Sequence, residues 1–157
     1  MKKFYTFLLF IITSFLVEVF ASFFVKVGMS KWYQGLVLPP YMPQTHFFPI
    51  IWIVLYFLIG LAGAVLWIHR NAHLGKISMF FWFIQLGLNA LWPICFFFLK
   101  NPWLGAIELS LLYIVSFLTM VYSFSSERIR PAGWLFIPYV LWLTFALYLN
   151  WAIVILN

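Results

Sequence analysis

Five long apolar stretches occupy almost the whole chain and constrain its fold more than any other feature. They run over residues 4–25, 47–68, 77–99, 103–124 and 134–156. Each is about 22 residues long, close to the roughly 20 residues that a helix needs to cross about 30 Å of hydrocarbon. We therefore predict an all-α integral membrane protein in which residues 1–157 form one domain, a bundle of five transmembrane helices.

The composition excludes a soluble protein. The chain is 66% hydrophobic and 8% charged, with a mean hydropathy of +1.06, and a soluble domain of 157 residues could not hide that much apolar surface. Its nine lysines and arginines are scattered over the predicted turns and form no basic run that would follow a phosphate backbone. We expect the lipid bilayer as a partner and no nucleic acid.

The basic residues also predict an orientation. Six lie on the side of the predicted bundle that holds the N-terminus: Lys2, Lys3, Arg70, Lys76, Arg128 and Arg130. Lys26, Lys31 and Lys100 lie on the other side. In a plasma membrane, this excess favours a cytoplasmic N-terminus. The first stretch also resembles a secretory signal, but at about 20 residues it exceeds the usual core of about 7–15, so we expect a retained helix.

The break over residues 26–46 is the longest and is rich in proline. Its prolines fix φ and oppose regular helix, which predicts a stiff, folded loop. The aromatic residues Trp32, Tyr33 and Tyr41 would give the loop an apolar underside that rests on the helix ends. We expect a lid, with Trp32, Tyr33, Pro39, Pro43 and His46 as its characteristic residues.

Three spans carry aromatic and amide side chains on single faces. Gln85, Asn89 and Trp92 share a face of the third span, and Trp52 and Tyr56 are one turn apart in the second. The fifth span has a similar stripe of Tyr139, Trp142, Ala146, Leu149 and Asn150. Polar groups in membrane helices are costly unless they face the bundle or a cavity.

These stripes predict a site for a flat, mostly apolar ligand with a few orienting hydrogen bonds. The predicted ligand-binding residues are Trp52, Tyr56, Asn89, Trp92, Tyr139, Trp142, Ala146 and Leu149. The alternative for each residue is structural, because tryptophan and tyrosine gather at membrane interfaces and amides join helices.

Other chemistry is poorly represented. His69 and His73 are four residues apart but lie in a polar turn with no carboxylate or cysteine nearby, so we expect no metal site. No catalytic triad, phosphate-binding loop or carboxylate pair is visible, and we assign no catalytic residue. Glu108 lies near the start of the fourth span, where a carboxylate suits the positive end of the helix. Glu18 lies deeper in its span, where it could pair with a loop cation.

Three segments resemble the translocator protein family, which is also known as TspO, tryptophan-rich sensory protein or peripheral-type benzodiazepine receptor. The first is Trp32–Leu36 followed by Pro39, Pro43, Trp52, Leu55 and Tyr56. The second comprises Gln85, Leu86, Leu88, Asn89, Trp92, Pro93, Phe96 and Phe97. The third comprises Pro138, Tyr139, Trp142, Phe145, Ala146, Leu149 and Asn150. The likeness covers nearly the whole chain, in order.

This resemblance implies a homodimer and a pocket near the Pro-rich loop that binds porphyrin or haem as a ligand, with no required cofactor. Trp52, Asn89 and Trp142 would line the pocket, with Ala146 and Leu149 as floor and wall. The implied function is a receptor, sensor or carrier of tetrapyrroles. The alternatives are an enzyme that degrades porphyrin in light and a structural membrane partner without a ligand.

The chain departs from the family pattern at several positions. Leu38 replaces a lysine before Pro39, and Tyr41 and His46 replace tryptophans, which could bring His46 near a haem iron. Trp151 and Ile155 stand where animal members carry the tyrosine and arginine of a proposed cholesterol motif, so the basic end of that motif is missing.

Overall fold

The computed structural model describes residues 1–29, 31–44 and 46–157, and its regular structure is helical. The elements are α1 (Lys2–Gly28), α2 (Lys31–Gln34), α3 (Phe47–Ile68), α4 (His73–Pro93), η1 (Ile94–Phe98), α5 (Pro102–Phe124) and α6 (Arg130–Leu156). With α4 and η1 taken as one, five helices within the described ranges are long and apolar enough to cross a membrane. The predicted five-helix fold is confirmed.

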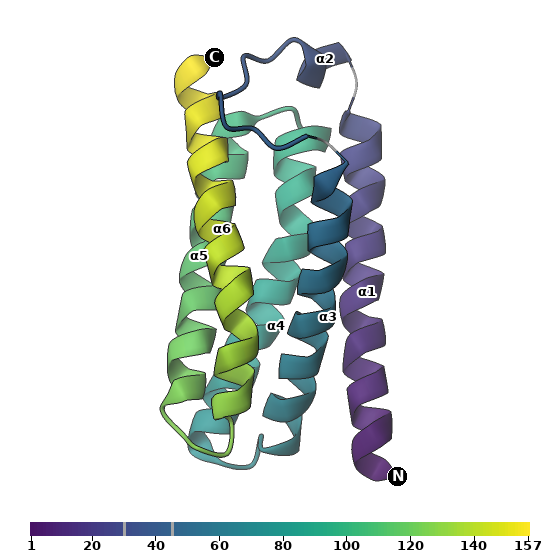
Figure 1. Ribbon diagram of the computed structural model, residues 1–157, viewed down its shortest axis with the longest axis vertical. Coiled ribbons are helices and arrows are strands. Elements are labelled where there is room, and N and C mark those ends of the chain that lie inside the picture. Colours follow the sequence, from purple (N-terminus) through teal and green to yellow (C-terminus); the bar gives the residue numbers. More distant parts are fainter. Residues whose placement is uncertain (30, 45) are drawn as a thin grey trace.

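Long helices that follow one another in the chain run antiparallel in one elongated bundle (Figure 1). α1 lies at the edge and packs against α3 and α4, whereas α5 packs against both α4 and α6, and α6 also contacts α3. The two termini lie at opposite ends. The Pro-rich loop crosses the end that holds the C-terminus, and the turns after α3 and α5 lie at the end that holds the N-terminus.

Several helices extend beyond the apolar stretches that predicted them. α1 continues to Gly28, α4 already begins at His73, and α6 begins at Arg130. The backbone keeps its helical hydrogen bonds past the last apolar residue. The predicted spans were shorter because hydropathy marks the hydrocarbon boundary and not the end of the helix. The polar turn between the predicted spans 47–68 and 77–99 is therefore confined to residues 69–72.

The third span changes its helical geometry at Pro93. This proline has no N–H to donate, and the chain continues as the π-helical segment η1, in which the Leu99 N–H donates to the Ile94 carbonyl at 2.9 Å. The wider turn brings Phe96 and Phe97 into the interior, where they are 2% and 7% exposed. These two rings later support the Pro-rich loop.

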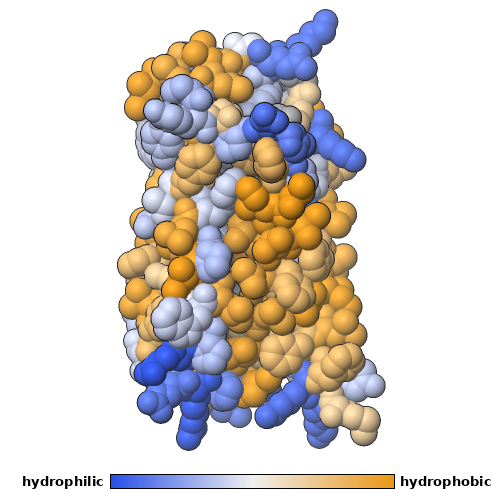
Figure 2. Space-filling model, in the orientation of Figure 1, coloured by the Kyte–Doolittle hydropathy of each residue, from blue (hydrophilic) through white to orange (hydrophobic). Residues whose placement is uncertain are grey.

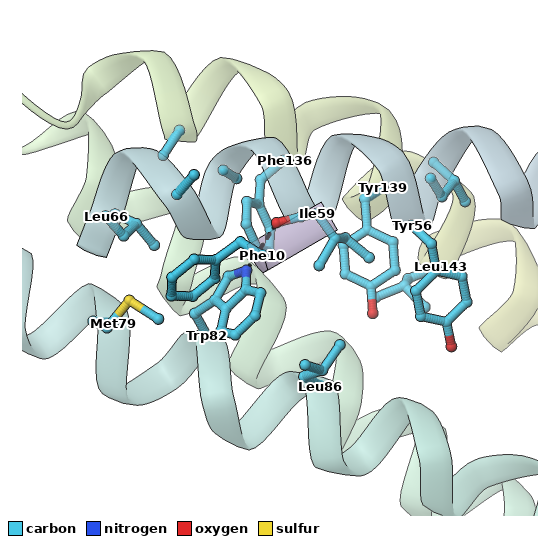
Figure 3. Close-up of a cluster of buried hydrophobic side chains, with 14 of the residues drawn as sticks. Phe10, Tyr56, Ile59, Leu66, Met79, Trp82, Leu86, Phe136, Tyr139 and Leu143 are labelled. Atoms are coloured by element: carbon cyan, nitrogen blue, oxygen red, sulfur yellow. Dashed lines mark hydrogen bonds between the residues drawn. The ribbon is translucent and has the colours of Figure 1, made fainter. Parts of the chain in front are cut away.

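The centre of the bundle is a packed aromatic core (Figure 3). Trp82 of α4 is fully buried, and its indole N–H donates to the Ile59 carbonyl of α3 at 2.9 Å. Its ring meets that of Phe10 from α1 edge to face at 5.1 Å. A Cβ at Gly63 would lie 2.5 Å from the Trp82 ring, so α3 and α4 approach closely here only because this residue is glycine.

The outside of the bundle suits a bilayer. Figure 2 shows a broad apolar band between two ends at which hydrophilic side chains gather. α1 is the least buried span: Phe10, Ser14 and Gly28 are buried, while Leu9, Leu16 and Phe23 are each at least 60% exposed. In water such a surface would aggregate, but in hydrocarbon it is the surface that lipid covers.

Candidate ligand-binding site

The aromatic stripes of α3 and α6 meet inside the bundle. The rings of Trp52 and Trp142 lie edge to face, with centroids 6.5 Å apart, and Tyr56 lies 5.7 Å from Trp52. The ring of Phe48, one turn before Trp52, also meets that of Trp142, with centroids 5.8 Å apart. Both tryptophans are half-buried, whereas Tyr56 is only 2% exposed. The structure therefore brings these predicted residues together as one aromatic cluster.

Beside this cluster, an amide on α4 bonds to α6. The Asn89 side-chain N–H group donates to the Gln85 side-chain oxygen at 2.9 Å and also to the Tyr139 hydroxyl. Asn89 is 4% exposed and Tyr139 is fully buried. Figure 3 shows the hydroxyls of Tyr56 and Tyr139 on the same side of their helices. The stripes of α3, α4 and α6 thus converge at one level of the bundle, as their periodicity predicts.

Buried polar atoms around this cluster are left unpaired. Within the described ranges, the Trp142 indole nitrogen and the Gln85 amide nitrogen are buried without a hydrogen-bond partner. Buried donors are nearly always satisfied in folded proteins. These atoms are therefore the groups that would orient a polar edge of a bound molecule.

Trp92 lies apart from this group. Its indole N–H donates to the Asn150 side-chain oxygen at 3.0 Å, and its ring stacks on Phe96 at 5.5 Å. Asn150 in turn donates to the Pro102 carbonyl of α5 at 3.0 Å. Trp92 therefore links α4 to α6 and stacks on the ring pair that lies beneath the loop.

The remaining predicted wall residues lie on α6. Ala146 is partly buried against the central core, and Leu149 is 4% exposed one turn farther along the helix. Both lie on the side of Trp142 toward the Pro-rich loop. Both side chains are apolar, which suits the wall and floor of an apolar site.

The Pro-rich loop covers the helix ends with two of its three aromatic rings. Tyr33, in the single helical turn α2 that precedes the first proline, is 8% exposed and lies 5.5 Å from Phe97. Trp32 meets Phe96 at 5.9 Å, and Pro39 is buried. The expectation for Tyr41 was wrong, because this residue is 73% exposed. It lies within a tight turn in which the Met42 N–H donates to the Pro39 carbonyl, and this turn leaves Tyr41 on the surface.

The far side of the loop is tied to the last residue of the chain, an anchor that our sequence analysis missed. The Asn157 side-chain oxygen accepts from the Val37 N–H at 2.9 Å, and its nitrogen donates to the Val37 carbonyl at 3.1 Å. No local pattern predicts a contact across 120 residues. Pro43 is partly buried, and His46 is exposed beside Phe47, with ring centroids 4.2 Å apart.

The two acidic residues within the spans differ in their surroundings. Glu18 accepts a hydrogen bond from the Ser22 hydroxyl at 2.7 Å, one turn along α1. Glu108 is 4% exposed, and both its carboxyl oxygens lack a hydrogen-bond partner within the described ranges. The start of α5 is capped by Asn101, whose side chain accepts from the Leu104 N–H at 3.0 Å. Glu108 therefore lies beyond the capped turn, buried in the bundle.

Surface hollows open at both ends of the bundle, and the residues that line them are not those of the stripes. A hollow of about 350 Å³ lies below the Pro-rich loop and is lined by Met29, Tyr33, Gln34 and Leu38. The other, of about 500 Å³, lies at the opposite end and is lined by Arg70, Asn71, Lys76, Met79 and Phe80. At the aromatic cluster, the rings of Trp52, Tyr56 and Trp142 pack against one another between the helices.

Comparison with known proteins relates nearly the whole chain to one group. Residues 9–156 match the model of the TspO/MBR family. The chain is 38% identical to the tryptophan-rich protein TspO of Archaeoglobus fulgidus, over 87% of this chain and 86% of that protein. It is 34% identical to protein CrtK of Rhodobacter capsulatus, with coverage of 82% and 79%. The human translocator protein is 27% identical, with coverage of 84% and 78%.

Proposed function

This chain belongs to the TspO/MBR family of multi-pass integral membrane proteins, and from that premise we propose that it is a receptor or carrier for a planar hydrophobic ligand, most simply a tetrapyrrole. The ligand would occupy the level at which the stripes of α3, α4 and α6 converge. Relatives of the chain are named tryptophan-rich sensory protein and translocator protein, names that describe sensing and translocation.

The observation that carries this proposal is the buried, unpaired indole N–H of Trp142 beside the edge-to-face ring of Trp52. A flat conjugated ring offers faces on which tryptophans stack, and polar atoms at its centre or edge can pair with an orphaned donor. Asn89 adds an amide whose hydrogen bonds can be redirected to a ligand. Because the rings now fill the space, binding would part Trp52 from Trp142.

The assembly and orientation follow as parts of the same proposal. The Pro-rich end would face away from the cytoplasm, because six of the nine basic residues lie at the other end. The protein would be a homodimer formed through α4. A Cβ at Gly87 would meet no atom within 4 Å, so this position is open for another helix.

The proposal is tested by titrating the purified protein with protoporphyrin and following tryptophan quenching. Trp52→Ala and Trp142→Ala should each weaken binding, since loss of a ring pair costs about 0.5–1.5 kcal/mol beyond the buried area. Trp134→Ala is the matched control, because Trp134 is on α6 but is 62% exposed. Wild-type affinity in both stripe variants, with intact helicity, would exclude the aromatic cluster as the site.

A second candidate function is light-dependent breakdown of the bound porphyrin. It is favoured by the closeness of three oxidisable rings, Trp52, Trp142 and Tyr56, within one cluster. Product analysis after illumination and in darkness separates the two functions, because a receptor or carrier releases its ligand unchanged in both. Absence of any titratable binding would leave the third possibility, a structural membrane protein whose aromatic residues only pack.

A further inference from the structure

The hollow at the end opposite the Pro-rich loop has a polar half and an apolar half. Arg70 and Asn71 belong to the turn between α3 and α4, and Lys76, Met79 and Phe80 belong to the first two turns of α4. Met79 is 5% exposed and forms part of the central core, whereas Phe80 is 62% exposed on the outer surface. The hollow, of about 500 Å³, is open to its surroundings and not an enclosed cavity.

The cation pair is held together by the tight turn between the helices. A Cβ at Gly75 would lie 2.1 Å from the His69 carbonyl oxygen, so only glycine allows α4 to start so close to the end of α3. The Ala72 N–H donates to the His69 carbonyl and closes the turn. Arg70, in the turn, and Lys76, in the first turn of α4, thereby line the same hollow.

Arg70 is already ordered. Its guanidinium lies 4.2 Å from the centre of the Trp67 ring, and its Nη1 donates to the Trp67 carbonyl at 2.8 Å. An arginine has five N–H donors in a planar fork, and the bond to the Trp67 carbonyl uses a single one of them. Because the side chain is fixed before binding, less conformational entropy is lost when an anion arrives.

The surroundings of the hollow are strongly cationic. Six of the nine basic residues lie at this end, and of the three acidic residues only Glu127 does. The first turn of α4 adds to this field, because its N-cap, Ala72, has no side chain that can accept the free N–H groups of the turn. Figure 2 shows hydrophilic side chains gathered at this lower end, directly below the apolar band.

Position in the membrane decides which anion fits. Residues 73–80 span about 10 Å along the helix axis, so the hollow runs from the interface into the outermost hydrocarbon. An anion bound by Arg70 and Lys76 would sit at headgroup level, and an attached chain would run down over Met79 and Phe80. Free phosphate would leave the apolar half empty.

We propose that this hollow is a binding site for an anionic phospholipid, with the phosphate held between Arg70 and Lys76 and an acyl chain packed on Phe80. The site is separate from the aromatic cluster, at the other end of the bundle, and does not depend on the proposed function. An anionic headgroup is favoured over a zwitterionic one because the end is cationic overall. Lipid held here would fix the depth and tilt of α3 and α4.

The test is native mass spectrometry of the full chain released from nanodiscs that contain phosphatidylglycerol and phosphatidylcholine with identical acyl chains. The wild-type protein should retain phosphatidylglycerol preferentially. Arg70→Gln with Lys76→Gln should lower that retention by about tenfold or more. The matched control is Arg128→Gln with Arg130→Gln, which removes the same charge from the same end but from outside the hollow, and it should retain the lipid.

Several results would overturn the proposal. They are unchanged retention in the Arg70/Lys76 variant, an equal loss in the Arg128/Arg130 control, and equal retention of the two lipids by the wild type. Competition by inorganic phosphate as effective as that by short-chain phosphatidylglycerol would identify a free-anion site and overturn the lipid assignment. Unchanged helicity of the Arg70/Lys76 variant, measured by circular dichroism, verifies its fold without relying on porphyrin binding.

Discussion

The helices of this bundle are joined in two different ways on its two sides. α1 meets α3 by close backbone approach, since a Cβ at Gly60 would lie 2.7 Å from the Cα of Ile11. α6 meets α4 and α5 through polar side chains, of which Asn150 bonds both Trp92 and the Pro102 carbonyl. Lipid gives helices no hydrophobic reason to associate, so both shape and hydrogen bonding are needed.

The difference explains where a ligand site can form. Where two helices touch through a glycine, their backbones are in direct contact. No ligand can enter between them, and the contact contains no hydrogen bond that a ligand could replace. A side-chain hydrogen bond can be exchanged for one to a ligand at little net cost. The aromatic cluster, with Asn89 and the unpaired Trp142 nitrogen, lies on the hydrogen-bonded side.

The largest effect is expected on the close-packed side. Gly60→Leu should lower the free energy of unfolding by about 3 kcal/mol, at the upper end of overpacking costs, because the new side chain meets the backbone of α1. The measurement is reversible unfolding in mixed micelles, followed by circular dichroism. If α1 moved aside without loss of stability, α1 would not be a fixed part of the bundle.

A smaller effect is expected on the hydrogen-bonded side. Asn150→Leu keeps the approximate volume but removes the bonds to Trp92 and Pro102. Interhelical hydrogen bonds in membranes contribute about 0.6 kcal/mol on average and up to about 1.7, so we expect a loss of about 1–3 kcal/mol for the two. A double-mutant cycle with Trp92→Phe isolates the α4–α6 bond, and zero coupling energy would contradict this view of the interface.

The loop should influence rates more than stability. Pro39→Gly with Pro43→Gly restores backbone freedom without removing an aromatic contact, so protoporphyrin release should accelerate by up to about tenfold with little change in the on-rate. Asn157→Ala, which frees Val37, should act in the same direction more weakly.

Stopped-flow chase experiments measure both rates of the loop variants. The exposed Tyr41 provides the matched control, Tyr41→Ala, within the same loop. An unchanged off-rate in a folded double-proline variant would show that the loop is not a lid. A lower on-rate alone would recast it as an entry guide.

The smallest effect on the folded monomer is expected at Gly87. Open space surrounds this position, so Gly87→Leu should leave unfolding unchanged while it shifts the detergent-solubilised protein from dimer to monomer. Light scattering measures the mass, and an unchanged dimer would exclude α4 as the interface. Gly60 and Ala64 are another pair of small residues one helical turn apart. However, α1 covers Gly60 and Ala64 is fully buried, so this pair is not open to a second subunit.

The sequence by itself determined the five spans, their antiparallel order and the faces that turn inward. The reason is that these properties depend on local periodicity: residues 85, 89 and 92 share a helix face whatever surrounds the helix. The meeting of Trp52 with Trp142, and of Asn89 with Tyr139, followed from the same rule, because a buried polar or aromatic stripe has only the bundle centre to face.

Only the tertiary structure decided which partner each inward side chain takes. It paired Trp92 with Asn150, tied Val37 to Asn157, left Glu108 buried without a partner among the described residues and placed Tyr41 outside the lid. It also brought Arg70 and Lys76 to one hollow. Such choices depend on the offset and rotation of one helix against another, which arise from packing across the whole bundle and leave no periodic signal in any single segment.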